Sequence, residues 1–390
     1  MKLTSVEQRA AVTIAGIYGL RMLGLFLVMP VLVLYARGMV DYSAALAGLA
    51  VGIYGLGQAL FQIPLGYLSD RIGRKPIIIA GLLIFALGSY IAATSETVIG
   101  LVIGRAIQGT GAIASTLMAF VSDLSRPEVR SKLMAGIGAT IGVAFVLSMV
   151  LGPWLTTYIG VDGLFYLTAV LSLVAIAVVI WLVPAEQNHS GSITALPVKA
   201  QLAQVFANSQ LQLMNLSIFV LHLLLTAIFV VIPGQLLDHG IPLEEHSIAY
   251  LVLMVISFVI MIPLMIWTEK NKAHSKTIPL AVCLLLIAML SLSLSPGMWL
   301  ILSCLGLFFI AFNFLEASIP SMVSRICGTN QRGTAMGFYS TSQFAGAFLG
   351  GLMAGLITQY FDMWTLFICL GALVLVWLLS VVAWLNPLED

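Results

Sequence analysis

The chain has 390 residues, a net charge of +1 and only 8% charged side chains, against 61% hydrophobic ones. A soluble domain carries roughly 25% charged residues, so this composition excludes an ordinary soluble protein. The four cysteines are far apart and fit neither a disulfide framework nor zinc spacing. The net charge gives no indication of a nucleic-acid partner, and we expect none.

Long apolar runs recur along the whole chain, as in residues 281–294 and 367–379. A helical span needs about 20 apolar residues, whereas a membrane β-barrel would show segments of about 10 residues that alternate in polarity. The continuous runs therefore predict spanning helices. The first run is too long for a cleaved signal peptide.

Breaks at charged residues, prolines and glycines predict twelve spans in two halves of six. The longest gap, between Pro184 and Gln212, predicts a linker. We therefore expect an all-α integral membrane protein with two pseudo-symmetric six-helix halves, residues 1–184 and 212–390, joined by a cytoplasmic linker over 185–211. The predicted spans are 10–36, 43–67, 76–94, 98–123, 133–158, 162–184, 212–236, 247–268, 277–294, 298–325, 333–358 and 362–385.

The basic residues orient this bundle. If both termini are cytoplasmic, 14 of the 17 Lys and Arg residues lie in loops or tails on that side. Arg21 and Arg105 fall within spans, which leaves only Arg37 outside. This distribution follows the positive-inside rule and predicts that both termini are cytoplasmic.

The most unusual polar stretch is the loop of residues 66–75, with the sequence GYLSDRIGRK. It joins two spans in a few residues, so Gly66 and Gly73 are expected to allow a tight turn. A positive-inside loop explains the basic residues, but it does not explain the glycine spacing.

This loop resembles the signature between helices two and three of the Major Facilitator Superfamily at six positions. Leu23-Gly24 followed by Pro30-Val31-Leu32 resembles the first-helix motif of its drug:proton antiporter branch, and residues 105–109 (RAIQG) resemble the fourth-helix motif. Some members of this branch carry a small soluble domain after helix twelve, and the sequence reaches Asp390 without one. The six signature positions are Gly66, Asp70, Arg71, Gly73, Arg74 and Lys75.

The resemblance implies a conformational latch. Asp70 would face the start of the eleventh helix near Gly333, where the helix dipole favours a carboxylate. Arg74 would pair with Asp123 at the cytoplasmic end of the fourth span. This cluster would hold the two halves together in the outward-open state, as a switch and not as a substrate site.

The fifth-span motif of the antiporters is only partly present. Gly152-Pro153 matches it as a helix-packing motif, but Ala139 and Ser148 stand at earlier glycine positions and two threonines replace the final glycine pair. This departure leaves both export and import open as directions of transport.

Apart from residues at the span ends, four candidate ionisable residues lie inside the predicted spans, where such groups are costly and usually functional or paired. Glu316 is a candidate for proton binding, or else a paired structural acid. Arg105 matches the motif linked to proton coupling, or anchors hydrogen bonds. His222 titrates in the right range but a lone histidine is more often a packing residue. Arg21 either attracts an anionic substrate group, tunes an acid, or forms a structural pair.

Neutral polar residues in the spans are candidates for lining a substrate cavity, or for holding helices together by hydrogen bonds. Gln58 and Gln62 are one helical turn apart and share a face. The complete set is Tyr54, Gln58, Gln62, Asn215, Asn313, Tyr339 and Gln343.

We therefore predict a proton-coupled secondary transporter of the bacterial inner membrane, a monomer that exports small organic compounds by alternating access. The alternatives are a proton-coupled importer of a sugar, amino acid or other metabolite, or a non-transporting sensor or channel. No phosphate-binding loop, metal-ligand cluster or nucleophilic triad is present in the sequence, so we expect no enzyme activity, no cofactor and no metal. The expected partners are the small-molecule substrate, protons and the lipid bilayer.

Overall fold

The computed structural model describes residues 3–184, 205–294, 297–327 and 332–385. The chain divides into two compact units, residues 1–194 and 195–390, and each unit is treated by itself. Most of the predicted linker lies outside the described residues. Among the described residues there is no β-strand, and Val40 and Thr97 form an isolated bridge.

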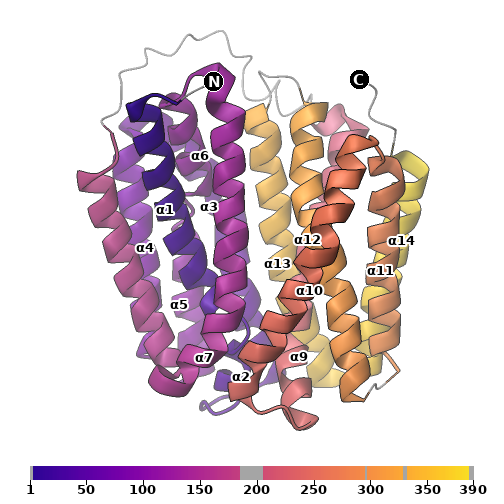
Figure 1. The fold of residues 1–390 in the computed structure, drawn as a ribbon. Helices are drawn as coiled ribbons and strands as arrows, with labels where there is room; N and C mark the ends of the chain where they lie inside the picture. Colours follow the sequence, from indigo (N-terminus) through magenta and orange to yellow (C-terminus); the bar gives the residue numbers. More distant parts are fainter. Residues whose placement is uncertain (1–2, 185–204, 295–296, 328–331, 386–390) are drawn as a thin grey trace. The chain divides into compact units, whose positions relative to one another are not determined.

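The first unit consists of helices that run side by side (Figure 1). Within it, α7 packs against α1 and α4, and α5 packs against α3 and α4. The helices are α1 (Ser5–Leu27), α2 (Leu32–Ala36), α3 (Ala44–Ile72), α4 (Arg74–Ala93), α5 (Val98–Thr110), α6 (Ala114–Asp123) and α7 (Pro127–Trp181).

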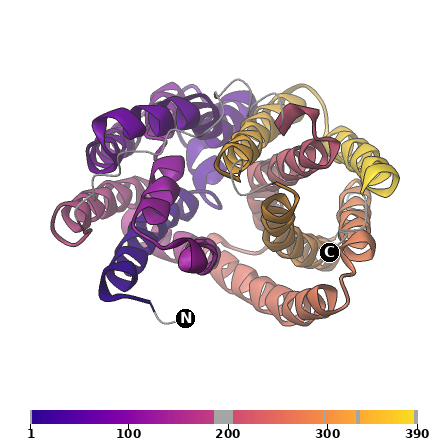
Figure 2. The ribbon, with the colours of Figure 1, turned by 90° about the horizontal axis from the view of Figure 1, so that it is seen from above.

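The second unit repeats this scheme of pairing. Here α13 packs against α9, α12 packs against α10 and α11, and α14 packs against α11. Seen end-on, each unit is a bundle of helices without a layered sheet (Figure 2). The helices are α9 (Ser209–Asp238), α10 (Leu243–Lys270), α11 (His274–Leu292), α12 (Met298–Ile326), α13 (Arg332–Tyr360) and α14 (Met363–Trp384).

The described helices account for the twelve predicted crossings. Ten helical segments are long and apolar enough to span a membrane, with α5 and α6 counted as one segment. α7 has 55 residues and a non-helical glycine, Gly160, with φ of 69°. A helix of that length would extend about 80 Å, well beyond a hydrocarbon core of about 30 Å, so α7 is two spans joined at Gly160. α13 supplies the remaining crossing.

The first predicted span, residues 10–36, is wrong in its bounds. α1 begins earlier, at Ser5, and ends at Leu27, and the short α2 begins only at Leu32. Pro30 lies in the interruption. Because proline has no N–H and its ring clashes with the preceding turn, it breaks a helix that hydropathy alone makes continuous.

The fourth predicted span is also interrupted, at residues 111–113 between α5 and α6. At this point Gly111 lies against the backbone of Gly81 in α4, so closely that a side chain on Gly111 would overlap the Gly81 carbonyl oxygen. The interruption leaves carbonyl groups of the fourth span without partners inside the helix, and one of them is used by a buried side chain described below.

Apolar side chains cover the outside of the helices as well as the core. α9 is buried on nearly every face between Leu211 and Leu236, whereas α10 exposes a continuous apolar surface. Such a surface is unstable in water and is suited to lipid. The exposed residues on α10 include Ile248, Leu251, Val252, Val255, Ile256 and Val259.

Close contact between α13 and α9 requires glycine at Gly346. A Cβ atom at this position would overlap the carbonyl oxygen of Phe219, whereas a Cβ at Gly337 on the same helix meets nothing within 4 Å. We expect Gly346→Ala to destabilise the protein by about 1–3 kcal/mol, the usual cost of overpacking. Thermal melting in detergent measures the loss, with Gly337→Ala as the matched control. Equal melting temperatures for the two variants would show that α13 does not pack on α9 in this way.

Candidate functional site

The loop of residues 66–75 is an abrupt connection between two helices. α3 ends at Ile72 and α4 begins at Arg74, so Gly73 alone makes the turn, with φ of 107° and ψ of 154°. Residues other than glycine are strongly disfavoured in that conformation. Gly66 allows a second close approach, because a Cβ there would lie 3.0 Å from the Ser115 hydroxyl oxygen. These two constraints explain the glycine spacing of the signature.

Arg74 connects three helices at this end of the first unit. Its Nε donates to Asp123 Oδ2 on α6 at 2.9 Å, and its guanidinium also forms an ion pair with Asp70 on α3. Nη1 donates to the Ser69 hydroxyl at 2.7 Å. The pair with Asp123 that the family resemblance implies is therefore present.

The other two basic residues of the signature have different contacts. Lys75 Nζ donates to the Val183 carbonyl at 2.8 Å, just past the end of α7, and Arg9 Nε donates to the Leu182 carbonyl at 2.8 Å. Cations at these carbonyls satisfy groups that a helix C-terminus leaves unpaired. Arg71 instead stacks over the ring of Tyr67 on its own helix, at 4.6 Å from the centroid.

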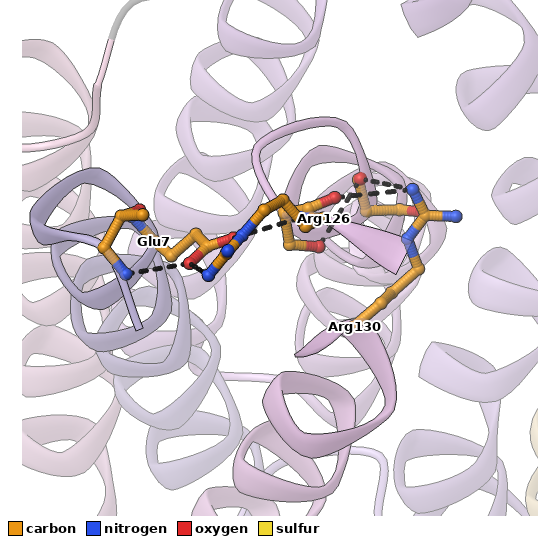
Figure 3. Close-up of polar contacts among 6 residues, drawn as sticks. Glu7, Arg126 and Arg130 are labelled. Atoms are coloured by element: carbon orange, nitrogen blue, oxygen red, sulfur yellow. Dashed lines mark hydrogen bonds and ion pairs between the residues drawn. The ribbon is translucent and has the colours of Figure 1, made fainter. Parts of the chain in front are cut away.

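A second ion pair at the same end was not anticipated from the sequence (Figure 3). Arg126 donates to the buried Glu7 through Nε at 2.7 Å, through Nη2 at 2.9 Å and through its backbone N–H at 3.1 Å. Arg126 is the N-cap of α7, so the carboxylate lies at the positive end of that helix dipole. The hydrogen bond to Glu7 raises the pKa of Arg126.

Two further contacts complete this cluster. Glu7 and Thr4 form a capping box at the start of α1, and Arg130 Nη2 donates to the Ser122 carbonyl near the end of α6 at 3.0 Å. The pattern of threonine followed three residues later by glutamate is a recognised helix-start signal. That signal predicts the cap, but it gives no indication of the partner 119 residues away.

The second unit has a corresponding cluster with the charges reversed. Glu269, near the end of α10, accepts from Arg325 Nη2 near the end of α12 at 2.6 Å. Its other oxygen lies 3.3 Å from His274 Nε2, at the start of α11. In the first unit, the shared residue is the cation Arg74, which lies between the acids Asp70 and Asp123. In the second unit it is an acid between two basic side chains.

Arg21 and Tyr54 lie in the apolar interior of the first unit. Arg21 Nη2 donates to the Tyr54 hydroxyl at 3.0 Å and to the Gly111 carbonyl at 3.2 Å. That carbonyl belongs to the interruption between α5 and α6. Arg105 approaches Tyr54 from α5, with Cζ 5.1 Å from the ring centroid. The structure thus brings together three of the predicted candidates.

Arg105 also belongs to a chain of hydrogen bonds. Its Nη1 donates to Gln108 Oε1 at 2.9 Å, and Gln108 Nε2 donates to the Ser89 hydroxyl at 2.6 Å. Gln58 Nε2 donates to the Gly109 carbonyl at 2.8 Å. Gln62 is buried, but its side-chain carbonyl oxygen has no hydrogen-bond partner among the described residues, so Gln62 remains separate from these bonds.

His222, Glu316 and Gln343 come together in the interior of the second unit, from α9, α12 and α13. Gln343 Nε2 lies 2.8 Å from His222 Nε2 and 3.2 Å from Glu316 Oε1. His222 Nδ1 lies 3.8 Å from Glu316 Oε2. Tyr339, one turn before Gln343, is buried, and its hydroxyl has no partner in the described part of the chain.

The remaining candidates lie apart from this group. Asn313 Nδ2 donates to the Ser257 hydroxyl at 2.7 Å, and that hydroxyl donates to the Phe309 carbonyl at 2.9 Å. This arrangement connects α12 to α10. Asn215 is buried, and its Nδ2 has no hydrogen-bond partner within the described ranges.

Gly152 and Pro153 lie within α7, where a Cβ on Gly152 would overlap the Leu27 carbonyl oxygen at the end of α1. Ser148 Oγ donates to the Leu23 carbonyl at 3.1 Å. This segment therefore packs α7 against α1. Gly333 is exposed near the start of α13, and its predicted proximity to Asp70 concerns the two units together and stays a prediction.

Glu7 should contribute strongly to the stability of the first unit. Glu7→Gln removes the charge that binds Arg126 and leaves a buried N–H₂ where the carboxylate accepts hydrogen bonds, so we expect a lower melting temperature. Glu128→Gln is the matched control, since Glu128 is exposed in the first turn of the same α7. Melting in detergent should show a clear decrease for Glu7→Gln alone; an equal decrease in both would contradict the assignment.

Comparisons with known proteins agree with this architecture. The chain is 43% identical over 378 residues to the inner membrane transport protein YajR of Escherichia coli K12, covering 97% of this chain and 83% of that protein. It is 32% identical over 197 residues to the class C tetracycline resistance protein of Escherichia coli, covering 50% and 49%. The crystal structure of the human organic anion transporter MFSD10 has a TM-score of 0.71 at 18% identity, covering 97% of this chain and all of that one.

The family itself follows from the sequence match. Residues 14–334 and 214–390 match the Major Facilitator Superfamily, and the extended similarity to an inner membrane transport protein supports the same assignment. The predicted fold, with twelve helices in two related halves, is confirmed. The chain is a membrane transporter that belongs to the Major Facilitator Superfamily.

Proposed function

We propose that this transporter is a proton-coupled antiporter, which exports small organic compounds by alternating access and takes up protons through Glu316 and His222. The observation that carries the proposal is the contact between these two titratable side chains in the interior of the second unit, 3.8 Å apart and bridged by Gln343.

The charges of this group favour binding of one proton. Among the described residues, no lysine or arginine contacts Glu316. With an ionised Glu316 and a neutral His222 the group has a net charge of −1, and one added proton makes it neutral in either of two ways. Because an uncompensated charge in the membrane interior is costly, loss of the proton needs a compensating event. Such a requirement couples a proton to another step of the transport cycle.

The hydrogen bonds also determine which ring nitrogen of neutral His222 carries the proton. Gln343 Nε2 can only donate, so neutral His222 accepts at Nε2 and carries its proton on Nδ1. Nδ1 is the nitrogen that faces Glu316. A small rearrangement would bring the Nδ1–H donor within hydrogen-bond distance of the Glu316 carboxylate, so the added proton binds on the carboxylate. A proton on His222 would be taken up at Nε2, and the Gln343 amide would then have to turn so that its oxygen accepts from it.

Export is supported by the relatives and by one packing motif. The similarity to a tetracycline resistance protein covers half of the chain, and Gly152-Pro153 resembles the antiporter motif. Ala139 and Ser148 depart from the glycine series of that motif. This departure favours the alternative, a proton-coupled importer of a sugar, amino acid or other metabolite.

The ion pairs around Arg74 support a conformational role at the cytoplasmic face. Arg74 holds the ends of α3 and α6 through Asp70 and Asp123. We place both termini in the cytoplasm of a bacterial cell, with the protein acting as a monomer in the inner membrane. Asp70 would then contact the second half near Gly333 only in the outward-open state, and its release would accompany inward opening.

The direction of coupling can be measured in proteoliposomes with an imposed pH gradient. We expect tetracycline or another organic compound to move against the proton flux, whereas glucose and alanine should not move. Protein-free liposomes correct for passive permeation. Movement of glucose, alanine or any other compound in the same direction as protons would contradict the proposed export and support the alternative, a proton-coupled importer.

Glu316→Gln tests the proton site. Glutamine keeps the size and the hydrogen bond to Gln343 but cannot take up a proton, so we expect transport to lose its pH dependence and its response to the gradient. Glu245→Gln makes the same change at an exposed site in the first turn of α10 and should behave as the wild type. Unchanged proton coupling in Glu316→Gln would remove this residue from the mechanism.

Asp70→Asn tests the latch. The variant loses the ion pair with Arg74, so we expect slower transport by about tenfold, a change of about 1.4 kcal/mol in the barrier. Ligand affinity in detergent should stay within about twofold, because Asp70 lies at the end of α3 and not in its buried polar segment. Loss of ligand affinity in a folded variant would indicate that Asp70 acts elsewhere than in the latch.

A further inference from the structure

Arg21 is one of the most buried charged residues of the chain, with 1% of its surface exposed. Among the residues that the structure describes, its guanidinium bonds only through Nη2, to Tyr54 and Gly111. Nε and Nη1 are both buried and have no hydrogen-bond partner in that part of the chain. Three of its five N–H groups are therefore available to another acceptor.

The surroundings of Arg21 contain positive charge and aromatic rings. The guanidinium of Arg105 lies over the face of the Tyr54 ring. Arg21 Cζ lies 5.6 Å from the centroid of the Phe85 ring. Tyr18, one turn before Arg21, is also buried. Among the described residues, no carboxylate forms an ion pair with either arginine. The interior of the first unit thus has two neighbouring cations without an acid.

A structural role explains only part of this arrangement. Arg21 satisfies the carbonyl that the interruption between α5 and α6 leaves free, and a neutral donor such as glutamine could do the same. Arg105 differs, because its Nε and Nη1 both donate to protein acceptors. An arginine buried with most of its donors unused costs free energy that a structural anchor does not require.

We propose that Arg21 binds the anionic head of the transported compound, so that the substrate class of this transporter is organic anions with a carboxylate or a group of similar geometry. A guanidinium matches a carboxylate through two parallel hydrogen bonds. The charge of Arg105 adds attraction, and the rings of Tyr18, Tyr54 and Phe85 offer apolar contact beside the charge. This inference rests on the proposed transport of small organic compounds, and it names their chemical class.

The test compares acids with their own amides, which have nearly the same size and shape. The probes are benzoate with benzamide, hexanoate with hexanamide, and 3-phenylpropionate with 3-phenylpropanamide. Binding to the purified full chain in detergent is measured by isothermal titration calorimetry, without a pH gradient. We expect at least one carboxylate to bind about tenfold tighter than its amide or better, since each tenfold step corresponds to one charge-assisted hydrogen bond.

The variants assign that preference to Arg21. In Arg21→Gln, the acid and its amide should bind with about equal affinity. Arg21→Lys, which keeps the charge but loses the planar donors, should retain part of the preference for the acid. Arg37→Gln removes the same charge from an exposed position and should leave the preference unchanged. Equal or absent binding within all three wild-type pairs overturns the proposal. The same holds for a preference that survives in folded Arg21→Gln, or that Arg37→Gln removes equally.

Failure of the proposed function can be told apart from failure of this inference. Binding of a carboxylate through Arg21, with no proton-driven movement of any compound in proteoliposomes, would reject the antiporter and keep the anion site. Proton-driven movement of compounds, with no difference between acids and amides, would keep the antiporter and reject the anion site.

Discussion

The interior of a bilayer contains no water to satisfy a polar group, so every polar atom buried there needs a partner within the chain or a ligand. This constraint explains why the chain is helical. It also explains how a place where a helix is interrupted can be tolerated. The fourth span is interrupted at residues 111–113, and the carbonyl of Gly111 is satisfied by Arg21. A side-chain donor thus satisfies a carbonyl that the backbone irregularity leaves free.

Polar groups at the helix ends are also satisfied by partners within the chain, here by charged side chains. In the first unit, Arg9 and Lys75 donate to carbonyls just past the end of the second span of α7, while Glu7 accepts from Arg126 at the start of its first span. The cations thus lie at the negative end of one helix dipole, and the carboxylate lies at the positive end of another. Exposed ion pairs contribute little to stability. The pair of the buried Glu7 with Arg126 is multiply bonded and holds the start of α1 against the start of α7.

The sequence predicted the helices well because hydropathy reports directly on the bilayer. The two errors in helix continuity have a common cause: Pro30 and Gly111 lie in apolar surroundings, and hydropathy does not detect a proline or a close backbone contact. The pair between Arg74 and Asp123 came from the family resemblance, since nothing in a separation of 49 residues indicates contact. His222, Glu316 and Gln343 were each recognised as unusual polar residues. Their meeting could not be predicted, because it depends on how three helices rotate about their axes.

The interiors of the two units differ in the sign of their buried charge. Among the described residues, the buried polar segment of the first unit has Arg21 and Arg105 and no acid bonded to them, and that of the second unit has Glu316 and no lysine or arginine bonded to it. Each unit alone therefore has an uncompensated charge, which is costly in a membrane. A mobile anion can compensate the first charge and a mobile proton the second. On the proposals made above, the species that the transporter moves would balance these charges, and this requirement would link their movements.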